Sequence, residues 1–177
     1  MERANILGVK VDVVTMDEAV AASCAIIEEH EPKMIATANA EMILRATKDE
    51  ELKDILNAAA LVVPDGAGAV WAANTLGYAM KERVAGYDLA HNLMKIAPKL
   101  GLKFYFFGSA PTVAEKAKTK AEELYEGIEI VGVHDGFFDE AEEKKIIFDI
   151  KEKRLMFCSL VWGYRNRKNG YLSIKEN

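Results

Sequence analysis

The chain has 177 residues, half of them hydrophobic, and a formal net charge of −5. This much apolar material can build one substantial core, so the composition predicts a single folded domain and excludes an intrinsically disordered protein. The acidic balance argues against nucleic acid as a partner, because neutralising phosphates needs a concentrated basic face. No run of about 18 apolar residues is present, so we expect no transmembrane helix, whereas attachment to a membrane surface stays open.

The cysteines and the N-terminus indicate the compartment. Cys24 and Cys158 lie far apart in the sequence, and neither has a second cysteine nearby. The first residues run into a strand-like segment and not into a signal peptide. We therefore expect a protein of the reducing cytoplasm.

Strand-like and helix-like segments alternate along the chain. Residues 5–14 form the first predicted strand, and a capping box at Thr15 and Glu18 opens a helix that runs to about Glu29. The later segments that contain a strand are 33–40, 60–66, 103–108 and 128–136, and the later predicted helices are 41–59, 67–77, 87–100, 111–125 and 139–153. Short buried strands between amphipathic helices indicate an α/β, Rossmann-like fold, with a mainly parallel sheet and helices on both faces.

Two loops at the ends of predicted strands carry polar side chains. Ligands of such sheets collect at the carboxyl ends of the strands, where loops lead into helices. Thr37 and Asn39 follow the second strand, although an asparagine there also serves as an ordinary helix cap. Asp65 lies between Pro64 and Gly66 and is a candidate general base, but capping the next helix is the more common role for a lone Pro-Asp-Gly.

Candidate phosphate and sugar contacts lie further along the chain. Gly108 and Ser109 end a strand just before Pro111, and free N–H groups there could hold a phosphate, although the same residues make a routine helix start. Arg83 is a candidate anion clamp and Asp88 a candidate acceptor for a sugar hydroxyl. Both are also compatible with solvated surface charges.

Several common chemistries lack their motifs. The three histidines, His30, His91 and His134, do not have metal-binding spacing, so we expect no metal centre. The dipeptide His134-Asp135 fits a strand-end turn as well as a metal pair. The dinucleotide, P-loop and nucleophile-elbow signatures are absent, so we predict no bound cofactor.

Five segments in order and spacing resemble one family. They are TANAEM (37–42), VPDGAGAVWAA (63–73), ERVAGYDL (82–89), FYFFGSAPTVAEKA (104–117) and IVGVHDGFF (130–138). Each segment is unspecific alone, but together they are similar to the WecG/TagA/CpsF glycosyltransferases. The resemblance covers roughly residues 5 to 153.

The resemblance implies an inverting, metal-independent glycosyl transfer at the cytoplasmic face of the cell membrane. For the TagA branch, it implies transfer of N-acetylmannosamine from UDP-N-acetylmannosamine to N-acetylglucosamine diphosphoundecaprenol, which makes the wall teichoic acid linkage unit. Asp65 matches the position of the family's proposed general base, and Thr37, Asn39 and Arg83 match its pocket motifs. The phosphate role of Gly108 and Ser109 comes from loop geometry and not from the family.

The chain departs from the family after residue 154. The family continues with a strand resembling D-[IV]-L-F-V-G-L-G and then with G-x-P-[KR]-Q-E, but residues 155–177 contain neither and are basic and aromatic. Codons for this tail, read one frame away, permit both motifs in order. Met156-Phe157 forces Val and Trp162-Gly163 forces Gly in that frame. We therefore predict a truncated catalytic domain at 1–154 and an out-of-frame tail at 155–177, with a divergent family member as the alternative.

This hypothesis has physical consequences. The apolar segment LMFCSLVWGY (155–164) is expected to take the place of the last strand, and residues 165–177 are expected to be poorly ordered. The chain is expected to fold but to transfer sugar poorly, and an uncovered apolar face would favour a homo-oligomer. The alternatives from other classes are a nucleotide-binding α/β phosphotransferase and a non-catalytic ligand-binding or assembly domain.

Overall fold

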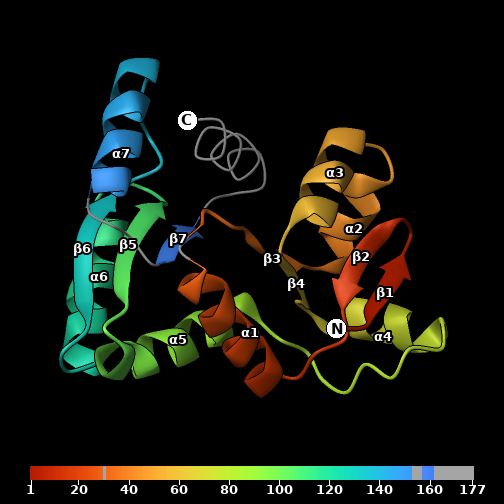
Figure 1. Cartoon of the computed structure of the whole chain (residues 1–177). Helices are drawn as coiled ribbons and strands as arrows, with labels where there is room; N and C mark the ends of the chain where they lie inside the picture. The colour runs from red at the N-terminus through yellow and green to blue at the C-terminus, as the bar shows by residue number, and fades with distance from the viewer. Residues whose placement is uncertain (30, 153–156, 162–177) are drawn as a thin grey trace. The chain divides into compact units, whose positions relative to one another are not determined.

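The computed structural model describes residues 1–29, 31–152 and 157–161. The chain forms two compact units, Met1–His91 and Asn92–Asn177, and the boundary falls within helix α5 (Gly86–Leu100). Helices alternate with strands, and the strand pairs that helices connect are parallel, so the predicted α/β class is confirmed (Figure 1). Among the helices described, none has both the length and the hydrophobicity that crossing a bilayer requires.

The first unit begins with a hairpin and not with the single strand predicted for residues 5–14. Strands β1 (Arg3–Ile6) and β2 (Val9–Asp12) pair antiparallel, and they are drawn in red in Figure 1. The two residues between them, Leu7 and Gly8, have φ of 52° and 92°. Two positive φ values in a two-residue loop match the twist of a hairpin, so the chain reverses inside an apolar run.

The helix that follows begins where the sequence predicts. In α1 (Met16–Glu28), the Thr15 side chain accepts from the Glu18 N–H, and the Glu18 carboxylate accepts from the Thr15 N–H. This reciprocal arrangement confirms the capping box. Strand β3 (Ile35–Ala38) then pairs in parallel with β4 (Leu61–Pro64), with Ala38 opposite Pro64.

The helix predicted for residues 41–59 is two helices, α2 (Ala40–Ala46) and α3 (Glu50–Ala58). Asp49 breaks the run, because its carboxylate accepts from the Leu52 N–H at 3.0 Å and starts a new helix. Helix α4 (Ala67–Thr75) follows β4.

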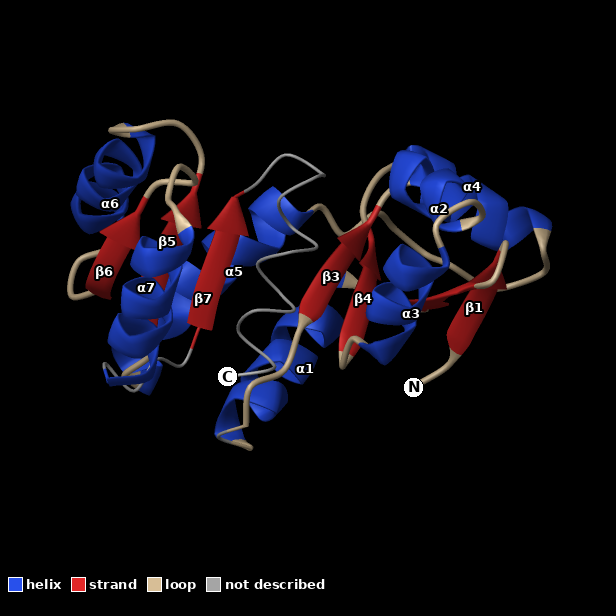
Figure 2. Cartoon of the chain, turned by 90° about the horizontal axis from the view of Figure 1, so that it is seen from above, coloured by secondary structure: helices blue, strands red, loops and turns tan. Residues whose placement is uncertain are grey.

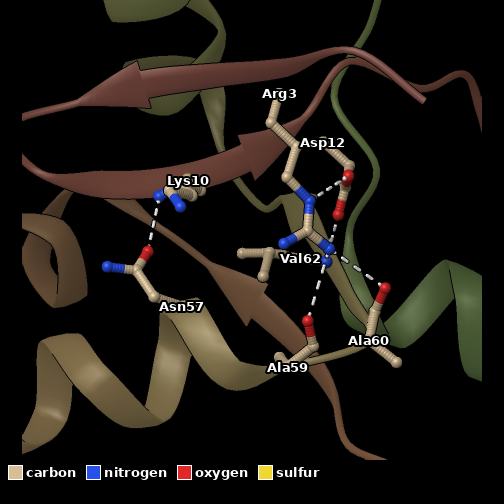
Figure 3. A network of polar contacts seen from close by, with 7 residues as sticks. All are labelled: Arg3, Lys10, Asp12, Asn57, Ala59, Ala60 and Val62. Atoms are coloured by element: carbon tan, nitrogen blue, oxygen red, sulfur yellow. Dashed lines mark hydrogen bonds and ion pairs between the residues drawn. The ribbon is translucent and has the colours of Figure 1, made fainter.

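A buried carboxylate fastens the hairpin to β4 (Figure 3). Asp12 is only 1% exposed, and its two oxygens accept from Arg3 Nε at 2.8 Å and from the Val62 N–H at 2.7 Å. Arg3 Nη2 also donates to the carbonyls of Ala59 and Ala60. The side chain of Asp12 thus supplies the acceptor that a neighbouring strand would supply to β4.

The second unit contains a three-stranded parallel sheet in the order β6-β5-β7 (Figure 2). Its elements are β5 (Lys103–Gly108), α6 (Val113–Leu124), β6 (Glu129–His134), α7 (Glu140–Glu152) and β7 (Phe157–Val161). Strand β7 lies within the segment predicted to replace the last strand, which confirms that part of the prediction. The predicted disorder of residues 165–177 lies outside the described residues.

Helices α6 and α7 belong to opposite faces of this sheet. The connection from β5 to β6 and the connection from β6 to β7 run in opposite directions across it. Because such crossovers are right-handed, they place their helices on opposite faces. Tyr105 and Phe107 of β5 pack against Ile146 and Ile150 of α7 on one of these faces.

Candidate active site

The carboxyl end of β3 carries Thr37 and Asn39. Thr37 is half-buried within the strand, and Asn39 is the N-cap of α2. Asn39 Oδ1 accepts from the backbone N–H of Met42 at 2.9 Å, so this oxygen has the helix-cap role. Asn39 Nδ2 makes no hydrogen bond to any described residue, so this nitrogen can donate to a ligand.

Asp65 stands one residue beyond the carboxyl end of β4. Its backbone N–H donates to the Ala38 carbonyl at 3.0 Å, which continues the pairing of β4 with β3 into the loop. The N-cap of α4 is Gly66, with φ of 112°, and no side chain of the described residues caps this helix. The cap alternative for Asp65 is therefore wrong. The carboxylate is half-buried, and none of the described residues forms a hydrogen bond or ion pair with it.

Arg83 lies on a loop segment, residues 78–85, that hydrogen bonds hold beside β4. The Val84 N–H donates to the Pro64 carbonyl at 2.9 Å, which places the neighbouring Arg83 at the same edge as Asp65. The Asn74 side chain of α4 forms two hydrogen bonds with the backbone of Met80, each 3.0 Å long. Three backbone contacts thus fix the segment at both of its ends.

A second contact of this segment reaches α1. Glu82 Oε1 accepts from the backbone N–H of Met16 at 2.5 Å. Arg83 itself is exposed, and its Nη2 lies 3.6 Å from Asp88 Oδ2 in the first turn of α5. Arg83 and Asp88 were predicted to have separate roles, and the structure brings them together as an exposed ion pair.

Two glycines allow close packing around these loops. A Cβ on Gly68 of α4 would lie 2.9 Å from Ala40 Cβ, and a Cβ on Gly86 of α5 would lie 2.7 Å from Thr37 Cγ2. Gly68 therefore allows the close approach of α2 to α4. Gly86 was not among the predicted site residues, and its sequence signal is a glycine at the first residue of a helix.

Gly108 and Ser109 belong to the second unit, so the structure does not place them with the other five candidates. Gly108 is buried at the end of β5 with φ of 110°, and Ser109 follows with φ of 70°. The Ser109 carbonyl accepts from the Gly136 N–H at 2.9 Å, which ties this loop to the loop after β6. Helix α6 begins at Val113, so the expectation that Pro111 is its first residue is wrong.

His134 has a packing role at the end of β6. Its ring packs edge-to-face against Phe107 and Phe138, and its Nδ1 lies 2.9 Å from the Asp135 carbonyl. Across the described ranges, no group of three or more His, Cys, Asp or Glu side chains is arranged to hold a metal ion. That the protein uses no metal stays a prediction.

Within the first unit, several polar side chains with different chemical roles lie at the carboxyl ends of β3 and β4. Asp65 offers a proton acceptor, Thr37 and Asn39 offer hydrogen-bond donors, and Arg83 offers a cation. A carboxylate next to donors and a cation suits a reaction in which a hydroxyl loses its proton while a phosphate-bearing group is held. This fold, with polar loops at the strand ends, is typical of α/β proteins that bind ligands there.

Comparison with known sequences identifies the protein family. A sequence profile described as the glycosyl transferase WecG/TagA/CpsF family matches residues 4–166. The chain belongs to this family of glycosyltransferases, which confirms the relationship predicted from the five segments.

Curated relatives share one name, N-acetylglucosaminyldiphosphoundecaprenol N-acetyl-beta-D-mannosaminyltransferase. The relative from Bacillus spizizenii is 28% identical over 142 residues, which cover 80% of this chain and 54% of the relative. The relative from Bacillus subtilis is 30% identical over 104 residues, 59% of this chain and 41% of the relative. The relative from Staphylococcus aureus strain NCTC 8325 is 28% identical over 151 residues, 84% of this chain and 59% of the relative. The chain therefore spans about half the length of these relatives.

Proposed function

We propose that this chain carries the catalytic centre of an inverting N-acetylmannosaminyltransferase. The donor is UDP-N-acetylmannosamine, and the acceptor is N-acetylglucosamine linked to undecaprenyl diphosphate. The name that the curated relatives share supports this acceptor and N-acetylmannosamine as the transferred sugar. The product would be the linkage unit of wall teichoic acid.

The state of the Asp65 carboxylate is the observation that carries this proposal. A carboxylate that caps a helix is committed to backbone N–H groups, whereas the Asp65 carboxylate is not used by α4. It is half-buried at the end of a strand whose four residues are all buried, so its position is fixed by the core. A fixed and uncommitted carboxylate can accept the proton of the acceptor hydroxyl as that hydroxyl attacks the sugar.

The departing UDP needs its charge stabilised without a resident metal. Arg83 is suited to this, because its ion pair with Asp88 is exposed and 3.6 Å long, and such pairs contribute little. A diphosphate could therefore replace the carboxylate at the guanidinium, and Asp88 would then accept a sugar hydroxyl. Gly108 and Ser109 are a further candidate phosphate site on the second unit.

The lipid-linked acceptor determines where in the cell the enzyme works. An undecaprenyl chain stays in the bilayer, so the enzyme must work at the membrane surface, and we place it peripherally at the cytoplasmic face. The protein needs no cofactor for this reaction, because the UDP-sugar is itself a substrate. The proposal includes association of the protein with further copies of itself at the membrane surface.

The test is transfer from UDP-N-acetylmannosamine to a lipid-diphosphate acceptor analogue. The assay uses the protein with the other reading frame restored after residue 154, because the 177-residue chain is expected to be weakly active. Asp65→Asn keeps the shape and removes the proton acceptor, so transfer should fall at least about a hundredfold. Asp54→Asn, on the exposed surface of α3, is the matched control and should keep its activity.

Binding to the 177-residue chain separates the alternatives. UDP or the UDP-sugar should raise its melting temperature, because a ligand that binds only the native state stabilises that state. A rise with ATP alone would favour a nucleotide-binding phosphotransferase instead. Binding of the UDP-sugar without any transfer in the restored protein would favour a ligand-binding domain.

A further inference from the structure

Gly86, the first residue of α5, touches the side chain of Thr37 in β3. A Cβ at position 86 would lie 2.7 Å from Thr37 Cγ2, 3.2 Å from its Cβ and 3.3 Å from its Oγ1. Gly86 is not among the glycines with positive φ, so its backbone conformation is open to any residue. The glycine is needed at this position for space and not for a turn.

Neither partner of this contact can withdraw easily. Thr37 lies inside the β3–β4 ladder, opposite Val63. The segment before Gly86 is held to β4 by the hydrogen bond from the Val84 N–H to the Pro64 carbonyl. A side chain at position 86 would therefore force Thr37 to rotate or α5 to move.

Either response would disturb the candidate site. Threonine is stiff at χ1, and rotation away from a clash at Cγ2 moves its hydroxyl to a different direction. A shift of α5 would instead move Asp88, which pairs with Arg83. The absence of a side chain at position 86 thus holds two parts of the site in one arrangement.

We propose that Gly86 is a positioning residue that sets the Thr37 hydroxyl for binding of the UDP part of the donor. This inference rests on the proposed function, because it assigns Thr37 to the donor site. It adds a residue that makes no contact with substrate itself and acts through its neighbour.

The test is a double-mutant cycle that measures the dissociation constant for UDP by calorimetry. Gly86→Ala should weaken binding about tenfold when Thr37 is present, roughly the value of one hydrogen bond. In the Thr37→Ser background, the 2.7 Å contact is gone and the hydroxyl remains, so the same substitution should weaken binding less than about threefold.

Gly68→Ala is the matched control. It is the same substitution, but its new Cβ meets Ala40 and not Thr37. Any effect of Gly68→Ala on UDP binding should therefore be the same with Thr37 and with Thr37→Ser. In the restored protein, Gly86→Ala should raise the donor KM more than it lowers kcat, because the Asp65 base is untouched.

Thr37→Val provides an independent test that creates no clash. It keeps the branched shape of the side chain and replaces the hydroxyl with a methyl group, so it should weaken UDP binding about tenfold. Unchanged binding in this variant would overturn the inference, as would an effect of Gly86→Ala that is equal in both backgrounds or confined to the melting temperature. If the unsubstituted chain binds neither UDP nor the UDP-sugar, the proposed function itself is wrong, which is a separate result.

Discussion

Asp12 is the residue on which the hairpin depends. The carboxylate is buried, and it satisfies both the guanidinium of Arg3 and the backbone N–H of Val62. A buried ion pair adds little net stability compared with an apolar pair, but removing one partner is costly, because the other group is left without compensation. The pair is thus more important for the register of β2 beside β4 than for the total stability.

Asp12→Ala should lower the free energy of unfolding by about 3 kcal/mol. The substitution leaves the Val62 N–H without its acceptor and the Arg3 guanidinium with only the carbonyls of Ala59 and Ala60. Urea unfolding at neutral pH measures the change. Asp54→Ala, on the exposed face of α3, is the control and should change stability by less than about 0.5 kcal/mol. A loss below about 1 kcal/mol for Asp12→Ala would show that the network is dispensable.

The first turn of α1 contains a titratable group, the Glu18 carboxyl. The Thr15 backbone N–H, and then the Thr15 hydroxyl, hold the pKa of Glu18 below its ordinary value of 4.5. A carboxyl group whose pKa is lowered by folding stabilises the native state while it is ionised. That contribution is fully present above the ordinary pKa and is lost as the pH falls through the lowered pKa of the folded state.

Glu18→Gln isolates this charge, because glutamine can still close the capping box. The unfolding free energies of the two proteins should differ above the ordinary pKa of 4.5 and converge in more acidic solution. Thermal or urea unfolding across that range, in matched buffers, gives the comparison. A difference that stays constant down to the most acidic conditions would mean that the Glu18 charge plays no part.

A second prediction at the element scale concerns the segment that carries Arg83. Met80 is buried, and its backbone N–H and carbonyl are both bonded to the Asn74 amide. Asn74→Ala should therefore speed hydrogen exchange of the Met80 amide and weaken UDP binding by releasing residues 78–85. Asn74→Asp keeps the acceptor for the Met80 N–H but loses the donor to the Met80 carbonyl, so it should give protection between those of the other two proteins. Equal exchange in all three proteins would show that other contacts hold the segment.

Local signals predicted most elements, because the determinants lie within a few residues. The capping box at Thr15 and the strand at 103–108 are of this kind, and both were placed correctly. The hairpin turn at Leu7 and Gly8 was missed, because apolar residues on both sides imitate one continuous strand. The break at Asp49 was also missed, although an aspartate before two glutamates is a recognisable helix start.

The candidate site was predictable only in part. Sequence placed Thr37, Asn39 and Asp65 at strand ends, but it could not decide between capping and catalysis, because both use the same residues in the same loops. The structure separates the two cases: Asn39 caps its helix and Asp65 does not. The contact of Gly86 with Thr37 depends on how α5 meets β3, and no local pattern encodes that distance.

At the scale of the molecule, the two units carry different candidates. The candidate base, donors and cation belong to Met1–His91, and the turn that contains Gly108 and Ser109 belongs to Asn92–Asn177. The second unit has the doubly wound order in which ligands bind beside the first strand, here β5. The family profile reaches residue 166 and thus includes β7.

The reading frame gives the last prediction. We expect the DNA that encodes residues 154–177 to spell G-x-P-K-Q-E when it is read one frame away. Restoring that frame should raise transfer well above that of the 177-residue chain, because the added motif would supply polar groups near the leaving UDP. Sequencing decides the first part, and side-by-side assays at equal protein concentration decide the second. Asp65→Asn in the restored protein is the control that ties any gain to the same catalytic centre. Robust turnover by the 177-residue chain would show that the added motif is not needed for transfer.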